Sequence, residues 1–265
     1  MLFSGIIEKE LSDRIHLTYF DVIENDDFDE CLNQCLPSIW FGPKDTRSIG
    51  ITKAKIAKYF STKLKNRSLI CGSCAEIFLH AYLGYNGYQQ ACLGSNLEEG
   101  SIKKGFDGFY LKDNEYWLME SKSSIYGKIP HHQKAEEAYQ DLCNKLNDFE
   151  GNDPWENALN HAVVAGVEGS IQNQIRMLAD DFTLERVHDP SEFNMIPCGT
   201  VFIGSVLTID EVEKLSNALS PYFENKDYLA LHIVCVSHSA LVGFLRYLNL
   251  EYADERHWLH YKIKK

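Results

Sequence analysis

Long apolar segments are missing from this sequence of 265 residues. Its most apolar stretch, YLALHIVCVSHSALVGFL at 228–245, is interrupted by His232, Ser237, His238 and Ser239. These polar positions favour a buried strand followed by a helix over a membrane span. The first residues, MLFSGIIEKELSD, also lack the basic start and apolar run that are typical of a signal peptide. The sequence therefore predicts a cytoplasmic protein that does not insert into a membrane.

An excess of positive charge is also missing. Lys and Arg number 26 against 38 Asp and Glu, a formal net charge of −12. A protein that binds nucleic acid unaided usually presents a basic surface, because neutralisation of phosphates drives that binding. Many proteins are acidic for solubility alone, so the net charge by itself does not exclude nucleic-acid binding. One stretch, 51–67, has basic side chains and no acid: Lys53, Lys55, Lys58, Lys63, Lys65 and Arg67.

Internal repeats and low-complexity linkers are absent as well, which favours one α/β domain. We expect an N-terminal extension over 1–68, a core over 69–147, and a helical and α/β part over 148–265. The extension would contain an acidic loop at 21–30, with breaks at Pro37 and Pro43. A basic helix over 51–66 would follow, whose cations either lie on a solvated face or face phosphates. The core pattern predicts a helix over 72–84, strands over 88–93, 106–111 and 115–123, and a helix after Pro130. A helical region over 154–180 and alternating strands and helices follow, with a last strand over 257–264.

Eight cysteines without a secretory signal indicate free thiols in a reducing compartment. CGSC at 71–74 directly precedes a predicted helix, and a helix N-terminus lowers the pKa of a thiol. A thiol oxidoreductase is therefore an alternative function. A zinc site that joins Cys71 and Cys74 to Cys31 and Cys35 is another, although the spacing of the second pair is loose.

The stretch GFDGFYLKDNEYWLMESKSS at 105–124 predicts a β-hairpin that contains charged residues. Asp113 and Asn114 tolerate the left-handed backbone that a two-residue hairpin turn requires. With that turn, residues whose numbers sum to 227 face one another. Asp107 then opposes Glu120, with the Cβ atoms within about 5.5 Å. Lys122 follows two residues later and points to the same face.

Two carboxylates that oppose each other repel, which a purely structural hairpin has no reason to accept. Mg²⁺ between them supplies a reason, because it binds one or two carboxylates together with water and substrate phosphate, and Mn²⁺ can substitute for it. The alternative is that Lys122 forms a surface salt bridge of little energetic value. A second Glu-x-Lys sequence, Glu224-Asn225-Lys226, falls in a predicted polar turn with no acid on a paired strand.

An acid at the start of one strand and Glu-x-Lys on the next, after a helix with a glutamate, resembles the PD-(D/E)xK nuclease superfamily. The matching residues are Glu76, Asp107, Glu120 and Lys122. The predicted order of helix, three strands, helix and strand also resembles its core. Residues 70–124, with GFDGFY and YWLMESKSS after the CAEIFLHAYL helix, resemble more closely the HamA-like nuclease subunit of Hachiman-type antiphage defence systems. We therefore expect a mixed central sheet flanked by helices, with a restriction-endonuclease-like core.

The resemblance implies a metal-dependent DNase that works with a superfamily-2 helicase encoded beside it. Asp107 and Glu120 would ligate Mg²⁺ together with the Ser121 carbonyl, and Lys122 would polarise the attacking water. The cations expected to steer the DNA backbone are those of 51–67 together with Lys103 and Lys104. A non-catalytic subunit with a nuclease fold, which only binds the helicase or DNA, is the alternative.

Two features close to this site have two interpretations each. Glu76 either completes the metal shell, as the resemblance implies, or closes a capping box that begins at Ser73. His131 and His132, at the start of the helix after Pro130, are expected to be exposed to solvent, with phosphate contact as the alternative.

Overall fold

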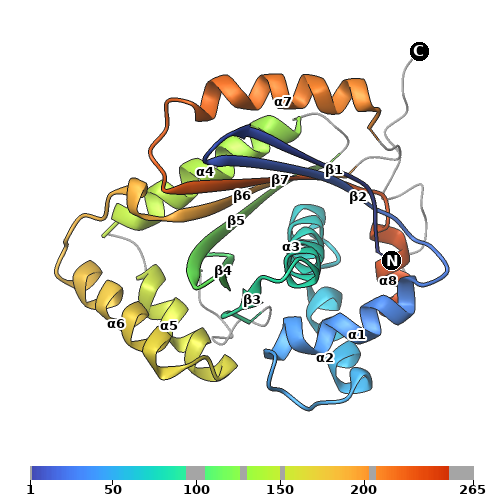
Figure 1. Cartoon of the computed structure of the whole chain (residues 1–265). Coiled ribbons are helices and arrows are strands. Elements are labelled where there is room, and N and C mark those ends of the chain that lie inside the picture. The colour runs from blue at the N-terminus through green and yellow to red at the C-terminus, as the bar shows by residue number, and fades with distance from the viewer. Residues whose placement is uncertain (1, 94–104, 126–129, 150–152, 203–206, 251–265) are drawn as a thin grey trace.

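The computed structural model describes residues 2–93, 105–125, 130–149, 153–202 and 207–250. The described strands form one seven-stranded mixed sheet in the order β1-β2-β7-β6-β5-β4-β3, with helices on both faces (Figure 1). The strands are β1 Phe3–Ser12, β2 Ile15–Val22, β3 Gln89–Gln90, β4 Gly108–Lys112, β5 Glu115–Ile125, β6 Asn194–Phe202 and β7 Ala230–His238. The expectation of a mixed central sheet flanked by helices is confirmed.

Helices α4 and α7 cover one face of the sheet, and α3 lies against the other with α1, α2 and α8 beside it (Figure 1). The helices are α1 Phe28–Phe41, α2 Ile49–Lys63, α3 Arg67–Tyr85, α4 His131–Asn147, α5 Pro154–Ala165, α6 Gly169–Thr183, the 3₁₀ turn η1 Pro190–Glu192, α7 Ile209–Phe223 and α8 Leu241–Tyr247. Within the described ranges, no helix combines the length and apolar character needed to cross a membrane.

The four central strands, β2, β7, β6 and β5, run parallel to one another. Every residue of β6 is buried, and so is nearly all of β7, as expected for parallel strands that have helices on both faces. The edge strand β1 instead alternates between exposed and half-buried residues, because one of its faces meets solvent. The N-terminal strands are therefore part of the central sheet, since β2 pairs with β7 along its whole length.

The predicted hairpin is confirmed in its register. Gly108 pairs with Met119 and Lys112 with Glu115, so the paired numbers sum to 227. Asp113 and Asn114 form the turn, with φ angles of 53° and 64°. Such left-handed angles match the twist of the two strands, which explains why a two-residue turn fixes this pairing.

Two helices differ from the expectations. An acidic loop and a break at Pro37 were expected where α1 forms, and Pro37 lies inside that helix. Its apolar residues, including Leu32, Leu36 and Ile39, are buried, so packing outweighs the hydrogen bond lost at proline. Helix α3 begins at Arg67, five residues before the expected start, because the Asn66 side chain caps it by accepting a hydrogen bond from the Leu69 N–H. The strand expected over 257–264 lies outside the described residues.

Helix α4 approaches the sheet closely over β6. A Cβ atom on Gly199 would lie 2.4 Å from the His131 carbonyl oxygen and 3.0 Å from the Ala135 nitrogen. Both are backbone atoms, so they have no side-chain freedom with which to yield. The missing side chain at Gly199 therefore lets α4 pack beside the middle of β5, where Glu120 and Lys122 lie.

We expect Gly199→Ala to lower the free energy of unfolding by about 1–3 kcal/mol or more, because the new methyl group forces α4 away from β6. Urea unfolding measures this. Gly72→Ala, in α3, is the matched control, since a Cβ there meets nothing within 4 Å. The control should be neutral or should stabilise by about 0.4–1 kcal/mol. Equal stability of the two variants would contradict the close packing of α4.

Candidate functional site

The predicted acids and amine meet at one end of the hairpin. Asp107 lies one residue before β4, and its Oδ2 accepts a hydrogen bond from the Ser121 N–H at 3.0 Å. Lys122 Nζ donates to Glu120 Oε1 at 3.1 Å. The N–H and C=O of one strand residue point to the same side of the strand, so the Ser121 carbonyl is directed to the edge where Asp107 lies.

Helix α4 adds two charged side chains that the sequence analysis missed. Asp141 Oδ2 lies 2.5 Å from Lys122 Nζ. Lys145 Nζ lies 2.5 Å from Glu120 Oε2 and 3.7 Å from Asp141 Oδ2. These contacts join Glu120 and Asp141 to the two ammonium groups, and Asp107 lies beside them through its hydrogen bond from the Ser121 N–H. We call the five side chains the carboxylate–lysine network: Asp107, Glu120, Asp141, Lys122 and Lys145.

A signal for these two residues is present in the sequence. Asp141 and Lys145 are four residues apart, so they share one face of α4. Buried Leu142 and Leu146 lie beside them in the sequence, which places that face at the margin of the core. A charged pair at such a margin indicates a partner on the sheet. That the partner is on β5 follows only from the tertiary packing of α4.

Burial controls the charge of Glu120, whose side chain is only 3 % exposed. Burial raises the pKa of its carboxyl well above the usual range, the Asp107 charge raises it further, and Lys145 and Lys122 oppose both effects. Burial alone would lower the pKa of Lys122 and Lys145, but the neighbouring carboxylates raise the pKa of both ammonium groups. The network thus keeps its lysines charged around a carboxylate that resists ionisation.

The network fits a divalent cation in its donor chemistry. Three carboxylates surround two ammonium groups, which leaves one negative charge uncompensated when all are ionised. Carboxylate and carbonyl oxygens are the ligands that Mg²⁺ and Mn²⁺ take. Among the described residues, no group of three or more His, Cys, Asp or Glu side chains is arranged to hold a metal. Asp107, Glu120 and the Ser121 carbonyl would therefore form a sparse ligand set that needs water or phosphate to complete it.

Glu76 is half-buried in the middle of α3. The capping interpretation is wrong, because the helix is capped by Asn66, ten residues earlier. The charges of Asp107 and Glu76 both raise the pKa of the Cys92 thiol, after the larger effect of burial. The carboxylates of Asp107 and Glu76 therefore both lie near the Cys92 thiol. Metal ligation by Glu76 stays a prediction.

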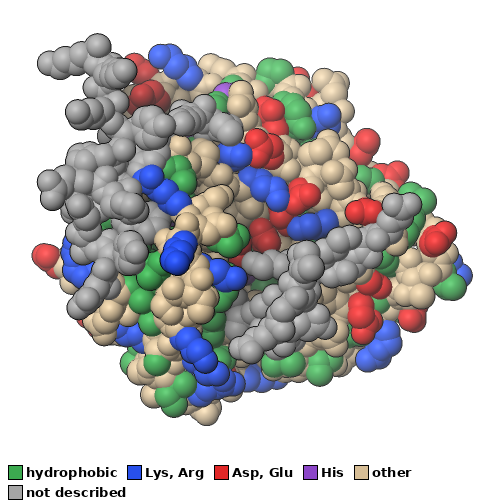
Figure 2. Space-filling model, turned by 180° about the vertical axis from the view of Figure 1, so that it is seen from behind, with side chains coloured by type: hydrophobic (Ala, Val, Ile, Leu, Met, Phe, Trp, Pro, Cys, Tyr) green, Lys and Arg blue, Asp and Glu red, His purple; other side chains and the backbone are tan. Residues whose placement is uncertain are grey.

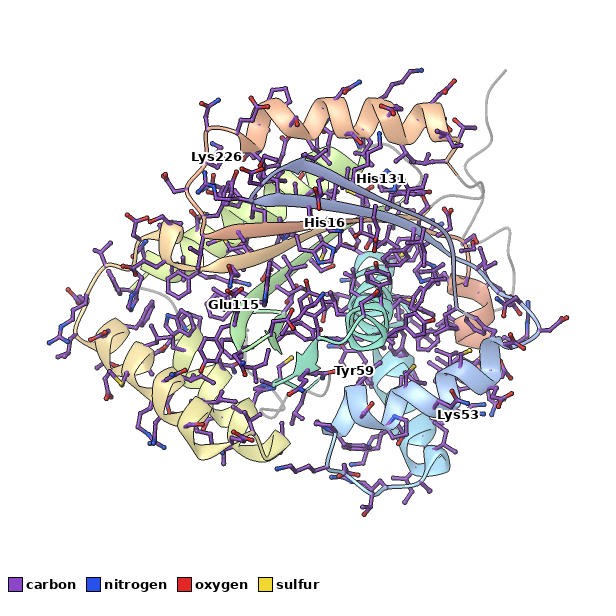
Figure 3. All side chains as sticks on the ribbon, in the orientation of Figure 1. His16, Lys53, Tyr59, Glu115, His131 and Lys226 are labelled. Carbon is purple, nitrogen blue, oxygen red and sulfur yellow. The ribbon has the colours of Figure 1, made fainter. Side chains whose placement is uncertain are left out.

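The basic stretch lies apart from the carboxylate–lysine network. Helix α2 packs on α1 and α3 (Figure 1), and Lys53 lies on α2, well away from His131 of α4 (Figure 3). Lys55, Lys58 and Lys65 are exposed. Figure 2 shows basic and acidic side chains interspersed over much of one face of the molecule. Lys103 and Lys104 lie outside the described residues.

The thiols of CGSC do not have the environment that redox chemistry requires. They lie inside α3 and not at its start, and both are buried. Burial raises the pKa of Cys71 to about 12 and that of Cys74 well above its ordinary value. Reactive thiols need a lowered pKa, so the oxidoreductase interpretation is wrong. Cys31 and Cys35 do not join them in a metal-holding group within the described part of the chain.

His131 is buried, so its expected exposure to solvent is wrong. Its Nε2 lies 3.3 Å from Ser237 Oγ at the end of β7. Figure 3 places His131 on the side of the sheet that α4 covers. Burial is the main cause that lowers the pKa of this imidazole to about 4. The ring is therefore neutral at physiological pH and is part of the structural packing of α4.

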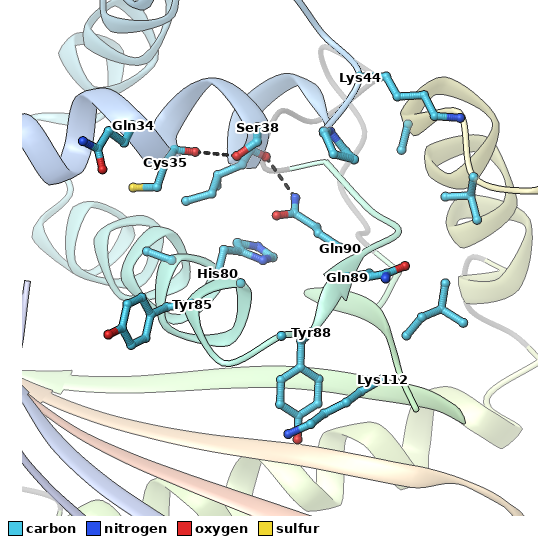
Figure 4. Close-up of a pocket in the computed structure, with 18 of the residues that line it drawn as sticks. Gln34, Cys35, Ser38, Lys44, His80, Tyr85, Tyr88, Gln89, Gln90 and Lys112 are labelled. Atoms are coloured by element: carbon cyan, nitrogen blue, oxygen red, sulfur yellow. Dashed lines mark hydrogen bonds between the residues drawn. The ribbon is translucent and has the colours of Figure 1, made fainter. Parts of the chain in front are cut away.

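A cavity of about 1040 Å³ opens between α1, α3 and the edge of the sheet at β3 (Figure 4). Gln34, Ser38 and Gln90 are among its polar lining, and Gln90 Nε2 donates to the Ile39 carbonyl at 3.0 Å. No member of the carboxylate–lysine network lines this cavity. The candidate site and the cavity are therefore distinct.

The fold and the site define an α/β protein with a buried glutamate, a half-buried aspartate and two lysines at the end of a hairpin. The profile of one protein family, HamA, matches residues 4–242. The chain belongs to the HamA family, which confirms the resemblance to HamA-like subunits of Hachiman-type defence systems. No curated protein and no solved structure matches the chain.

The buried His131 predicts a pH dependence of stability. The unfolded chain takes up a proton near pH 6.5 and the folded chain only near pH 4, so stability falls as the pH drops between these values. Between pH 7.5 and 5 the wild type should lose about 2 kcal/mol more than His131→Gln in chemical unfolding. At pH 8 and above, the difference between the two proteins should be constant. An identical pH dependence would contradict a buried neutral ring.

Proposed function

We propose that this protein is a metal-dependent DNA nuclease, the effector subunit of a Hachiman-type antiphage system in the cytoplasm that acts with a superfamily-2 helicase. Membership of the HamA family supports a role in such a system. The observation that carries the nuclease proposal is the hairpin end, where Glu120 and Lys122 meet beside Asp107. An acid pair and an amine in this arrangement are the groups that a PD-(D/E)xK nuclease requires.

The chemistry follows from the positions of the side chains. A divalent Mg²⁺ or Mn²⁺ would supply an activated water and offset charge on the scissile phosphate. Asp107 and Glu120 would hold the metal ion, with the Ser121 carbonyl beside them. Lys122, whose ammonium stays protonated, would orient the water and stabilise the anionic transition state. Lys122 and Asp141 side chains are each about a third exposed, so the phosphate has access from that side.

DNA binding would be shared with the partner. The net charge of −12 disfavours tight binding of DNA by this chain alone. The exposed lysines of 51–67, with Lys103 and Lys104, would guide the backbone, whereas the helicase would supply most of the affinity. This division is consistent with basic side chains that lie apart from the carboxylate–lysine network.

One observation favours the non-catalytic alternative. Both carboxylate oxygens of Glu120 are already paired with lysines, Oε1 with Lys122 and Oε2 with Lys145. Such a closed set of ion pairs can exist for structure alone, although buried ion pairs contribute little net stability compared with apolar packing. Cleavage assays separate the two functions.

We expect the purified protein, together with its helicase, to cleave plasmid DNA when Mg²⁺ is present. Glu120→Gln and Lys122→Met should each lower the cleavage rate by at least about 10²-fold, because each removes a group that stabilises the transition state. Gel assays of initial rates measure this.

The second Glu-x-Lys sequence provides a matched control. Glu224 is exposed and Lys226 Nζ lies over the Tyr222 ring, 4.7 Å from its centroid. The double variant Glu224→Gln and Lys226→Met should keep wild-type rates. Cleavage that survives Glu120→Gln and Lys122→Met would remove the assignment of the site. Complete lack of cleavage by the wild-type complex would support the non-catalytic alternative.

A further inference from the structure

Each oxygen of the buried Glu120 carboxylate is held by a different lysine, and the two lysines come from different elements. Lys122 is on β5 itself, and Lys145 reaches across from α4. Lys145 Nζ also donates to the Gly105 carbonyl at 3.1 Å, two residues before Asp107. One ammonium group therefore links α4 to β5 and to the segment that leads into β4.

Lys145 lies where a divalent cation would have to bind. Its ammonium group contacts Glu120 Oε2 and the Gly105 carbonyl, and its pKa is raised by the charge of Asp107 as well as that of Glu120. Carboxylate and carbonyl oxygens are also the ligands of Mg²⁺ and Mn²⁺. Two cations that need the same oxygens compete for them.

Asp141 offers the ammonium group a second position. Its Oδ2 lies 3.7 Å from Lys145 Nζ and 2.5 Å from Lys122 Nζ. Both ammonium groups can therefore move away from Glu120 and still have the Asp141 carboxylate as a partner. A buried charge that loses its only partner costs several kcal/mol, so a second carboxylate nearby makes the exchange feasible.

We infer that Lys145 is the resident cation of this site: its ammonium group holds Glu120 Oε2 in the metal-free protein, competes with the divalent ion, and moves to Asp141 when the ion binds. This inference rests on the proposed metal-dependent function. It assigns Lys145 a positioning role, since it keeps Glu120 and the Gly105–Asp107 segment together before metal arrives. The Lys145 ammonium group that has moved to Asp141 would then add positive charge beside the position where phosphate would lie.

The test is Mn²⁺ binding to the metal-free full-length chain, measured by titration calorimetry without DNA. Lys145→Met should bind Mn²⁺ between about five- and 150-fold more tightly than the wild type, because the competing charge is gone. Lys145→Arg keeps the charge and should bind no more tightly than the wild type. Lys145→Gln removes the charge but keeps a donor for the Gly105 carbonyl, and it should behave as Lys145→Met does.

Lys134→Met is the matched control on the same helix. Lys134 pairs with Glu137 at 2.5 Å and is not part of the network, so its removal should leave the Mn²⁺ affinity unchanged. Thermal unfolding confirms that each variant is folded. Weaker or unchanged Mn²⁺ binding by folded Lys145→Met and Lys145→Gln would overturn the inference while leaving the proposed function intact. If the wild type, Lys145→Met and Lys145→Gln all fail to bind Mn²⁺, the metal site itself is contradicted.

Discussion

The candidate site depends on one buried carboxylate. Glu120 lies in the middle of a strand that is covered by helices on both faces, next to the acid Asp107, and burial alone disfavours its charged form. Two lysines compensate for this, one from its own strand and one from α4. The close packing of α4 on β6 at Gly199 is what brings the second lysine within reach. A carboxyl group that is costly to ionise is thus held where a divalent cation could take the place of the ammonium groups.

The hairpin that presents Glu120 was predictable from the sequence because its register depends on local chemistry. Asp113 and Asn114 accept left-handed backbone, and a two-residue turn then fixes every pair between the strands. Since side chains alternate along strands, the common face of Asp107, Glu120 and Lys122 follows from that turn. This part of the site needs no long-range contact to specify it.

The contribution of α4 was not predictable in the same way. Asp141 and Lys145 read as an ordinary helical i,i+4 pair, and only the distance between α4 and β5 shows that they face Glu120. The burial of His131 has the same origin, because the first turn of α4 packs against the end of β7. Two helices depend on further details: the Asn66 side chain caps α3 five residues before the expected start, and Pro37 lies inside α1, whose buried apolar residues outweigh the break that proline favours.

We propose that a divalent cation binds between Asp107 and Glu120, and the rest of the site's chemistry depends on that ion. A crystal of the protein soaked in Mn²⁺ tests this proposal most directly, by anomalous scattering. The account predicts one strong peak in contact with Glu120 and Asp107 carboxylate oxygens, with the Lys145 ammonium group displaced toward Asp141. A fully occupied Mn²⁺ elsewhere, with both lysines still paired to Glu120, would contradict it.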